Sequence, residues 1–128
     1  MGVSSVTERI GLWLPPLALM VVIYVLSDQP NLNSGLGLID TIARKLVHAG
    51  EYALLCVLWW RALRTGTGER SSLALAFAIC VSYAVTDEYH QTFVEGRTGN
   101  ALDVGIDALG AAAGGWWAQR RLIRARTA

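Results

Sequence analysis

The feature that most constrains this chain is a series of four apolar segments, at residues 10–26, 46–60, 73–85 and 104–118. A helix needs about 20 apolar residues to cross roughly 30 Å of hydrocarbon, and each segment is shorter than this. A hydrophobic content of 53% with five Trp and only 16% charge is nevertheless typical of a membrane protein. We therefore predict an all-α, polytopic membrane protein with four transmembrane helices in a single domain, residues 1–128.

Basic residues mark one end of three of these helices. Arg61 follows the second segment, Arg70 precedes the third and Arg120 follows the fourth. Counting about 20 residues from these basic ends extends each helix through polar residues at its other end. The predicted spans are residues 10–27, 44–63, 72–91 and 101–119. Three spans then carry ionisable groups into the same leaflet, where such groups are functional candidates.

The distribution of basic residues also predicts the orientation. Eight of the eleven lie at the N-terminus, between the second and third spans, or at the C-terminus. The other three are Arg44, Lys45 and Arg97. The positive-inside rule then places both termini in the cytoplasm and the chain in the plasma membrane, with the polar helix ends facing outward.

Several local patterns predict how the helices pack. Gly110 and Gly114 form a small-xxx-small pattern that lets backbones approach closely, so we expect the fourth span to be the central helix. Pro15 and Pro16 predict a kink in the first span. The segment 27–44 is predicted to be an outer loop, with Asp40 as the N-cap of the second span. Irregular backbone is predicted at Asn31, Asn33, Ser34, Gly35 and Gly37. Interfacial anchoring is predicted for Trp13, Trp59, Trp60, Trp116 and Trp117.

The polar ends of the second, third and fourth spans supply the candidate site. Lys45, His48 and Glu51 are spaced by three, so they share one helix face, and Asp103 and Asp107 share a face of the fourth span. Packing the helices together then predicts a polar cleft that opens outward. The candidate catalytic residues are His48, Asp87, His90 and Asp103. The candidate ligand-binding residues are Lys45, Glu51, Glu88, Gln91 and Arg97.

Two functions suit such a cleft. In the first, the charged groups pair with one another, pin the helices together and bind an amphiphilic ligand such as a membrane lipid or a lipid-tailed molecule without turnover. In the second, a histidine acts as general acid or base with a carboxylate, Asp87 or Asp103, to orient it. Lys45 and Arg97 would then bind an anionic group of an envelope lipid.

Other readings are less favoured. No cofactor is predicted, and a metal site at the histidines is disfavoured by the nearby cations Lys45 and Arg97. A conduction pathway is disfavoured because the inner halves of the spans contain almost no polar residues. A net charge of +1 without a basic stripe argues against a nucleic-acid partner. Glu88 is also a candidate for the solvated surface, together with Asp28 and Glu95, and His90 has no predicted direction.

The chain resembles the VanZ-like membrane protein family in a series of short motifs. The motifs are Leu26-Ser27-Asp28-Gln29-Pro30, Lys45-Leu46-Val47-His48 followed by Glu51-Tyr52, Asp87-Glu88-Tyr89-His90-Gln91, Gly96-Arg97, and Asp103-Val104 ahead of Gly110. The similarity runs from Leu26 to Gly115. Arg44 departs from the pattern, since the family often has Asp at this position before the Lys.

This resemblance implies a small polytopic membrane protein of the cell envelope. It also implies a link to low-level resistance against lipid-tailed glycopeptide antibiotics such as teicoplanin. It supplies no biochemical mechanism, and the oligomeric state stays open.

Overall fold

The computed structural model describes residues 3–29, 35–97 and 99–128, which form four helices and no strand. The helices are α1 (Val3–Ser27), α2 (Leu38–Leu63), α3 (Glu69–Gln91) and α4 (Ala101–Thr127). The prediction of an all-α chain with four helices is confirmed. The observed helices are longer than the predicted spans, because α2 begins six residues earlier and α4 ends eight residues later.

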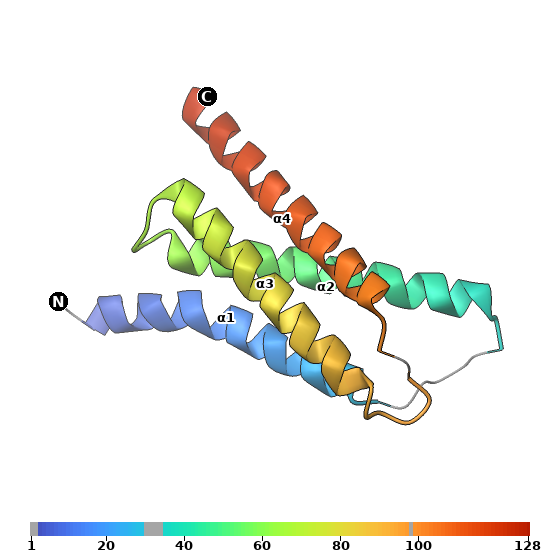
Figure 1. The fold of residues 1–128 in the computed structure, drawn as a ribbon. Coiled ribbons are helices and arrows are strands. Elements are labelled where there is room, and N and C mark those ends of the chain that lie inside the picture. The colour runs from blue at the N-terminus through green and yellow to red at the C-terminus, as the bar shows by residue number, and fades with distance from the viewer. Residues whose placement is uncertain (1–2, 30–34, 98) are drawn as a thin grey trace.

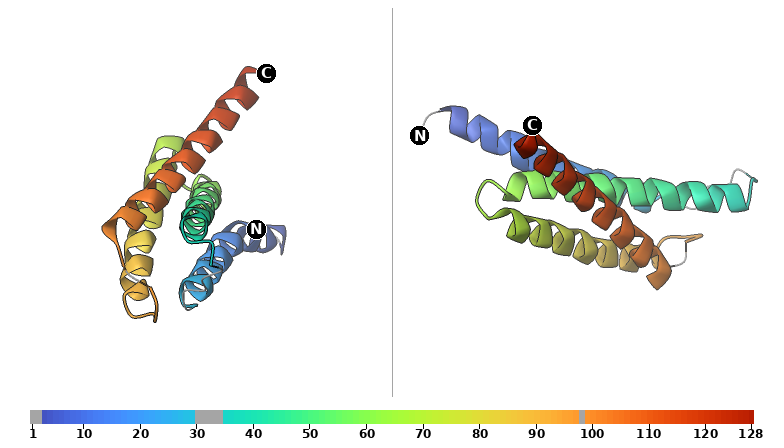
Figure 2. Two further views of the ribbon diagram at one scale, coloured as in Figure 1. Left: turned by 90° about the vertical axis from the view of Figure 1, so that its right-hand side faces the viewer. Right: turned by 90° about the horizontal axis from the view of Figure 1, so that it is seen from above.

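Successive helices run in opposite directions, so the N-terminus, the α2–α3 turn and the C-terminus lie toward the same end (Figure 1). As a result α2 and α4 run the same way. Helix α2 lies between α1 on one side and α3 and α4 on the other (Figure 2), and it packs against all three. Among the described residues, α1 makes no packing contact with α4. The expectation that the fourth helix is central is therefore wrong, and α2 holds that position.

The small residues of α4 do make the close approach that the sequence predicts. A Cβ added at Gly110 would lie 2.2 Å from the carbonyl oxygen of Ala49, and one at Gly114 would lie 2.2 Å from that of Ala53. Ala49 and Ala53 have the same spacing as the two glycines, so small residues face each other on both helices. This close approach joins α4 to α2, while other faces of α4 stay exposed, Leu109 among them.

Helix α2 begins at Leu38, and its N-cap is Gly37, whose positive φ of 55° suits glycine. Asp40 lies in the first turn rather than at the cap, so its predicted capping role is wrong. A carboxylate there still complements the positive end of the helix dipole. The irregular backbone predicted at Asn31, Asn33 and Ser34 lies outside the described residues.

Exposed apolar side chains cover much of the molecule. In α1, Val21, Leu14 and Val25 are all at least half exposed, and the helix continues through Pro15 and Pro16 and bends along its length (Figure 1). Two helical segments, Ser5–Ser27 and Glu69–Gln91, are long and apolar enough to cross a membrane. Because apolar surface of this extent is unfavourable in water, it suits a lipid environment.

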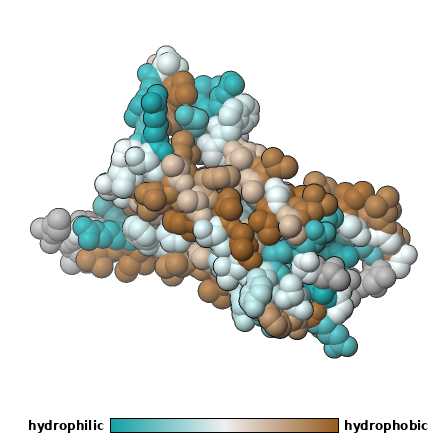
Figure 3. Space-filling model, in the orientation of Figure 1, coloured by the Kyte–Doolittle hydropathy of each residue, from teal (hydrophilic) through white to brown (hydrophobic). Residues whose placement is uncertain are grey.

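The surface is not uniformly apolar. Hydrophilic residues gather at the C-terminal end of α4 and again where the start of α4 crosses α2 (Figure 3). Apolar side chains in the first part of α2, including Leu38, Ile39 and Leu46, are also exposed. The tryptophans divide into two groups, since Trp59 and Trp60 are buried between helices whereas Trp13, Trp116 and Trp117 are exposed.

Candidate functional site

A cavity of about 280 Å³ lies where the start of α4 crosses α2, with α3 and the α3–α4 loop completing its wall. Its volume is near the lower end of small-molecule sites, which span ~300–1,000 Å³. Twelve residues line it: Thr41, Arg44, Lys45, His48, Glu88, Gln91, Gly96, Arg97, Asn100, Asp103, Ile106 and Asp107. Nine of these carry a charged or titratable side chain or a side-chain amide. We refer to this space as the cavity.

Two ionisable pairs cross from α2 to α4 at the cavity. Lys45 Nζ lies 2.6 Å from Asp103 Oδ1, which is a charge-assisted hydrogen bond between half-buried groups. One turn further along both helices, His48 Nδ1 lies 3.6 Å from Asp107 Oδ1, which is too long for a hydrogen bond. The two pairs come in the same order along α2 and α4 because these helices run in the same direction. Just beyond the second pair, Ala49 of α2 and Gly110 of α4 are in close contact.

Asp107 is the least satisfied group of the cavity. Its side chain is 1% exposed, and neither carboxylate oxygen accepts a hydrogen bond from any residue that the structure describes. The buried hydroxyl of Tyr52 and the Oδ1 atom of Asp87 also have no partner among those residues. A buried polar atom without a partner is costly, so such a group marks a place where a water or a ligand is expected.

Arg44 is a second charged residue of the cavity whose side chain is not satisfied by the described residues. Its side chain lines the cavity and, within the described ranges, makes no ion pair. Glu88, in contrast, is only 5% exposed and its Oε1 accepts a hydrogen bond of 2.8 Å from the backbone N–H of Asn100. Glu88 thereby fixes the start of α4 against α3, and its interpretation as a solvated surface residue is wrong.

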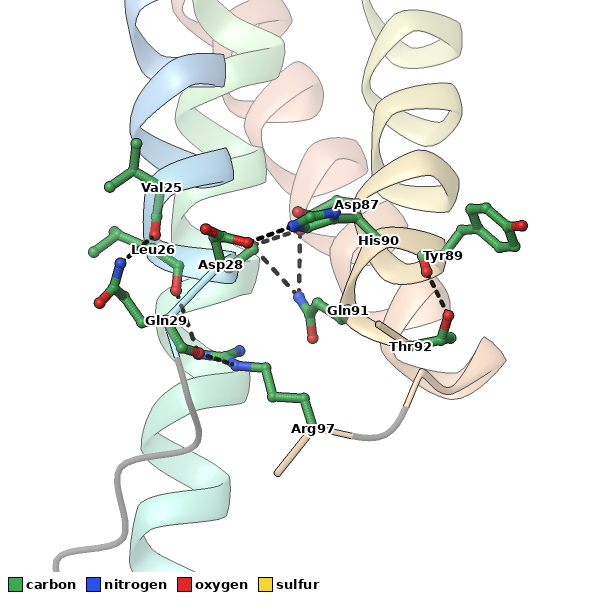
Figure 4. A network of polar contacts seen from close by, with 11 residues as sticks. Val25, Leu26, Asp28, Gln29, Asp87, Tyr89, His90, Gln91, Thr92 and Arg97 are labelled. Carbon is green, nitrogen blue, oxygen red and sulfur yellow. Dashed lines mark hydrogen bonds and ion pairs between the residues drawn. The ribbon is translucent and has the colours of Figure 1, made fainter. Parts of the chain in front are cut away.

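A second polar cluster lies beside the cavity, between the end of α1 and the end of α3 (Figure 4). We call it the clasp, and it consists of Ser27, Asp28, Gln29, Asp87, His90, Gln91 and Arg97. Ser27 Oγ donates to Asp87 Oδ2 at 3.0 Å, and Gln91 Nε2 lies 3.4 Å from Ser27 Oγ. His90 Nε2 lies 2.9 Å from Asp28 Oδ1. The clasp therefore joins α1 to α3, and Ser27 and Asp87 within it are 60 residues apart in sequence.

Arg97 belongs to both the clasp and the cavity. Its guanidinium donates to the carbonyl oxygens of Gln29 and Leu26 at 2.8 and 3.3 Å, so it caps the C-terminal end of α1. The turn before it contains Gly96 with a φ of 75°, a conformation that favours glycine. Carbonyl partners carry no full negative charge, so the positive charge of Arg97 is available beside the cavity.

The structure separates the predicted site residues into two groups. Lining the cavity are Lys45, His48, Glu88, Gln91, Arg97 and Asp103. Asp87 lies behind Gln91 in the clasp and His90 faces α1, while Glu51 is half-buried on α2 and does not line the cavity. Within ion-pair distance, His48 lies beside Asp107 and His90 beside Asp28, rather than beside the Asp87 or Asp103 named from the sequence.

Several cavity residues were not among the predicted site residues. Arg44 and Asn100 could not be assigned to the site from the sequence. Arg44 is the first residue of the predicted second span and Asn100 lies just before the fourth, where no periodic pattern assigns a residue to a helix face. Asp107 did give a signal, since it is four residues from Asp103 and therefore shares its face. It lies one turn before Gly110, where α4 closely approaches the backbone of α2, and this places it against His48.

Comparison with known proteins gives one match. The family model described as VanZ/LLP1 matches residues 4–123, nearly the whole chain, in agreement with the resemblance seen in the motifs. Searches of curated proteins and of solved structures returned no match.

Proposed function

The chain belongs to the VanZ/LLP1 family, and from this premise we propose that it is an integral membrane protein whose cavity binds an amphiphilic ligand of the cell envelope. The ligand would place a polar headgroup in the cavity and its apolar chain in the surrounding lipid. All four helices would cross the membrane, with both termini in the cytoplasm and the cavity toward the outer face. The imbalance of eight basic residues against three supports this orientation.

The observation that carries this proposal is the presence in one space of two charged side chains whose polar atoms are not satisfied. Arg44 has no ion pair and Asp107 has no hydrogen bond among the residues that the structure describes, yet both line the cavity. A network that only held helices together would leave no such groups, because each unpaired charge opposes folding. Exposed Leu38, Ile39 and Leu46 near the cavity would contact the apolar part of the ligand.

Lipid retention in native mass spectrometry tests the proposal. The purified full chain would be incubated with a phospholipid mixture of defined composition, and retained lipid would be counted for the unaltered chain and for Thr41→Trp, which fills the cavity. Thr86→Trp is the matched control, because both threonines are exposed, helical and donate to the carbonyl four residues earlier. We expect Thr41→Trp to weaken retention by about tenfold, or ~1.4 kcal/mol. Equal retention by both variants would exclude the cavity as the binding site.

One observation favours catalysis as a second candidate function. His48 faces the cavity and lies beside the buried Asp107, an arrangement in which a carboxylate orients an imidazole for acid–base chemistry. The distance of 3.6 Å would shorten to a hydrogen bond when a ligand closes the site. The His48→Gln variant tests this, with turnover of a membrane lipid extract followed by mass spectrometry. Catalysis predicts that new lipid species vanish while lipid retention persists, and no new species from the unaltered chain would rule it out.

The family membership also supports a role in susceptibility to glycopeptide antibiotics. The inhibitory concentration of teicoplanin would be compared between cells that express the unaltered chain and cells that express Thr41→Trp at equal membrane abundance. We expect the unaltered chain alone to raise it. An equal effect of both would separate the phenotype from the cavity.

A further inference from the structure

The charges around the cavity are balanced in number. Three cationic side chains line it, Arg44, Lys45 and Arg97, and three carboxylates, Glu88, Asp103 and Asp107. A ligand with several negative charges would need an excess of cations, as phosphate sites usually provide. This lining instead suits a headgroup that carries one charge of each sign.

Two of the six charged groups, Arg44 and Asp107, accept or donate no hydrogen bond among the described residues. Lys45 is paired with Asp103, and Glu88 accepts the Asn100 N–H. Arg44 has no ion pair and Asp107 no hydrogen bond among the described residues. Arg97 donates only to the backbone carbonyls of Gln29 and Leu26, so its positive charge is available beside that of Arg44. The negative group left for the ligand is Asp107, which is 1% exposed.

The buried carboxylate also indicates which kind of cation fits. No group of three or more His, Cys, Asp or Glu side chains suited to a metal ion occurs in the described part of the chain. No Trp, Tyr or Phe lines the cavity either, so it lacks the aromatic cage that binds quaternary ammonium groups. A primary ammonium, with three N–H donors, would satisfy the two free oxygens of Asp107.

We propose that the cavity binds the headgroup of a phospholipid that carries a primary amine, with its ammonium on Asp107 and its phosphate on Arg44 beside Arg97. This inference rests on the proposed function and specifies the ligand class for the same site. Arg44 supplies the planar fork of donors that matches phosphate oxygens. A 280 Å³ cavity holds a headgroup but not two acyl chains, which would stay in the lipid.

The test compares three lipids with identical acyl chains on the unaltered full chain by native mass spectrometry. Phosphatidylethanolamine has both groups, phosphatidylcholine has a methylated amine that donates no hydrogen bond, and phosphatidylglycerol has no amine. We expect phosphatidylethanolamine to be retained at least about fivefold better than either of the others. This comparison needs no mutation, so it holds whether or not a variant folds.

Two variants then assign the contacts. Asp107→Asn should abolish the preference for phosphatidylethanolamine over phosphatidylglycerol, whereas Arg44→Gln should weaken both lipids alike. Asp28→Asn, which changes a carboxylate of the clasp outside the cavity, should keep the preference.

The outcomes separate this inference from the proposed function. Phosphatidylglycerol or phosphatidylcholine could be retained as well as phosphatidylethanolamine, or better, with retention still lost in Thr41→Trp. This result would overturn the inference that the headgroup carries a primary amine, but it would support an amphiphile-binding cavity. Retention of none of the three lipids would overturn both.

Discussion

The cavity and the clasp are neighbouring polar clusters that share α3, and they differ in how far their buried carboxylates are satisfied. In the clasp, Asp87 Oδ2 accepts from Ser27 and lies 3.5 Å from Gln91 Nε2. In the cavity, Asp107 is equally buried and accepts nothing from the described residues. The clasp holds α1 against α3, since its groups pair across the two helices. The cavity leaves Arg44 and Asp107 without such contacts among the described residues, as a site for a partner from outside the chain would.

The largest effect expected is on the helix contact that forms the cavity. Gly110→Leu places a side chain against the backbone of Ala49, so α4 must move away from α2. We expect the free energy of unfolding to fall by about 3 kcal/mol or more, the upper end for overpacking. Thermal unfolding in detergent measures this loss, and lipid retention should vanish with it.

The matched control is Gly105→Leu on the same helix. A Cβ at Gly105 meets nothing within 4 Å, so this variant should unfold at nearly the wild-type temperature. Similar destabilisation of both variants would mean that the α2–α4 contact does not set the result, since leucine has a higher helix propensity than glycine.

The second prediction compares the two buried carboxylates directly. Asp87→Ala leaves Ser27 without its acceptor, and we expect it to lower the free energy of unfolding by about 1–3 kcal/mol. Asp107→Asn removes a buried carboxylate that accepts no hydrogen bond from the described residues, so the free energy of unfolding should stay within about 1 kcal/mol of that of the unaltered chain or exceed it. Unfolding in denaturant measures both values. A larger loss at Asp107 would reverse the contrast between cavity and clasp.

The smallest effect is expected at the exposed edge of the clasp. The carboxylate of Asp28 is 54% exposed, and His90 beside it is 26% exposed. Asp28→Asn should therefore change the free energy of unfolding by less than about 1 kcal/mol, as exposed ion pairs do. A double-mutant cycle with His90→Gln isolates the pair from other contacts. A coupling energy well above this value would show that the clasp is closed to water at His90.

Helix content was predictable from the sequence because apolar runs and basic flanks act locally. The small-xxx-small pattern at Gly110 and Gly114 correctly predicted a close backbone approach, but it could not say which helix becomes central. The central helix is the one that contacts all the others. Helix α2 contacts α4 through Ala49 and Ala53, and it also packs against α1 and α3. A residue pattern on one helix carries no information about the faces of its neighbours.

The candidate site was predictable only in part for a related reason. Residues on one helix face, such as Lys45 and His48, were correctly placed together because their spacing fixes a shared direction. The partner of each histidine was not predictable, since His48 and His90 lie near several carboxylates in sequence. Only helix packing decided that His48 faces Asp107 and that His90 faces Asp28.

By itself the sequence determined the four helices and their polar ends, because these follow from residues that are close together in the chain. It also determined the family to which the chain belongs, because the family motifs occur in order along the chain. The tertiary structure alone decided that Asp87 accepts a hydrogen bond within the clasp, whereas in the cavity Asp107 accepts no hydrogen bond and Arg44 makes no ion pair among the described residues. The physical reason is that satisfaction of a buried charge depends on the groups that other helices bring within hydrogen-bonding distance.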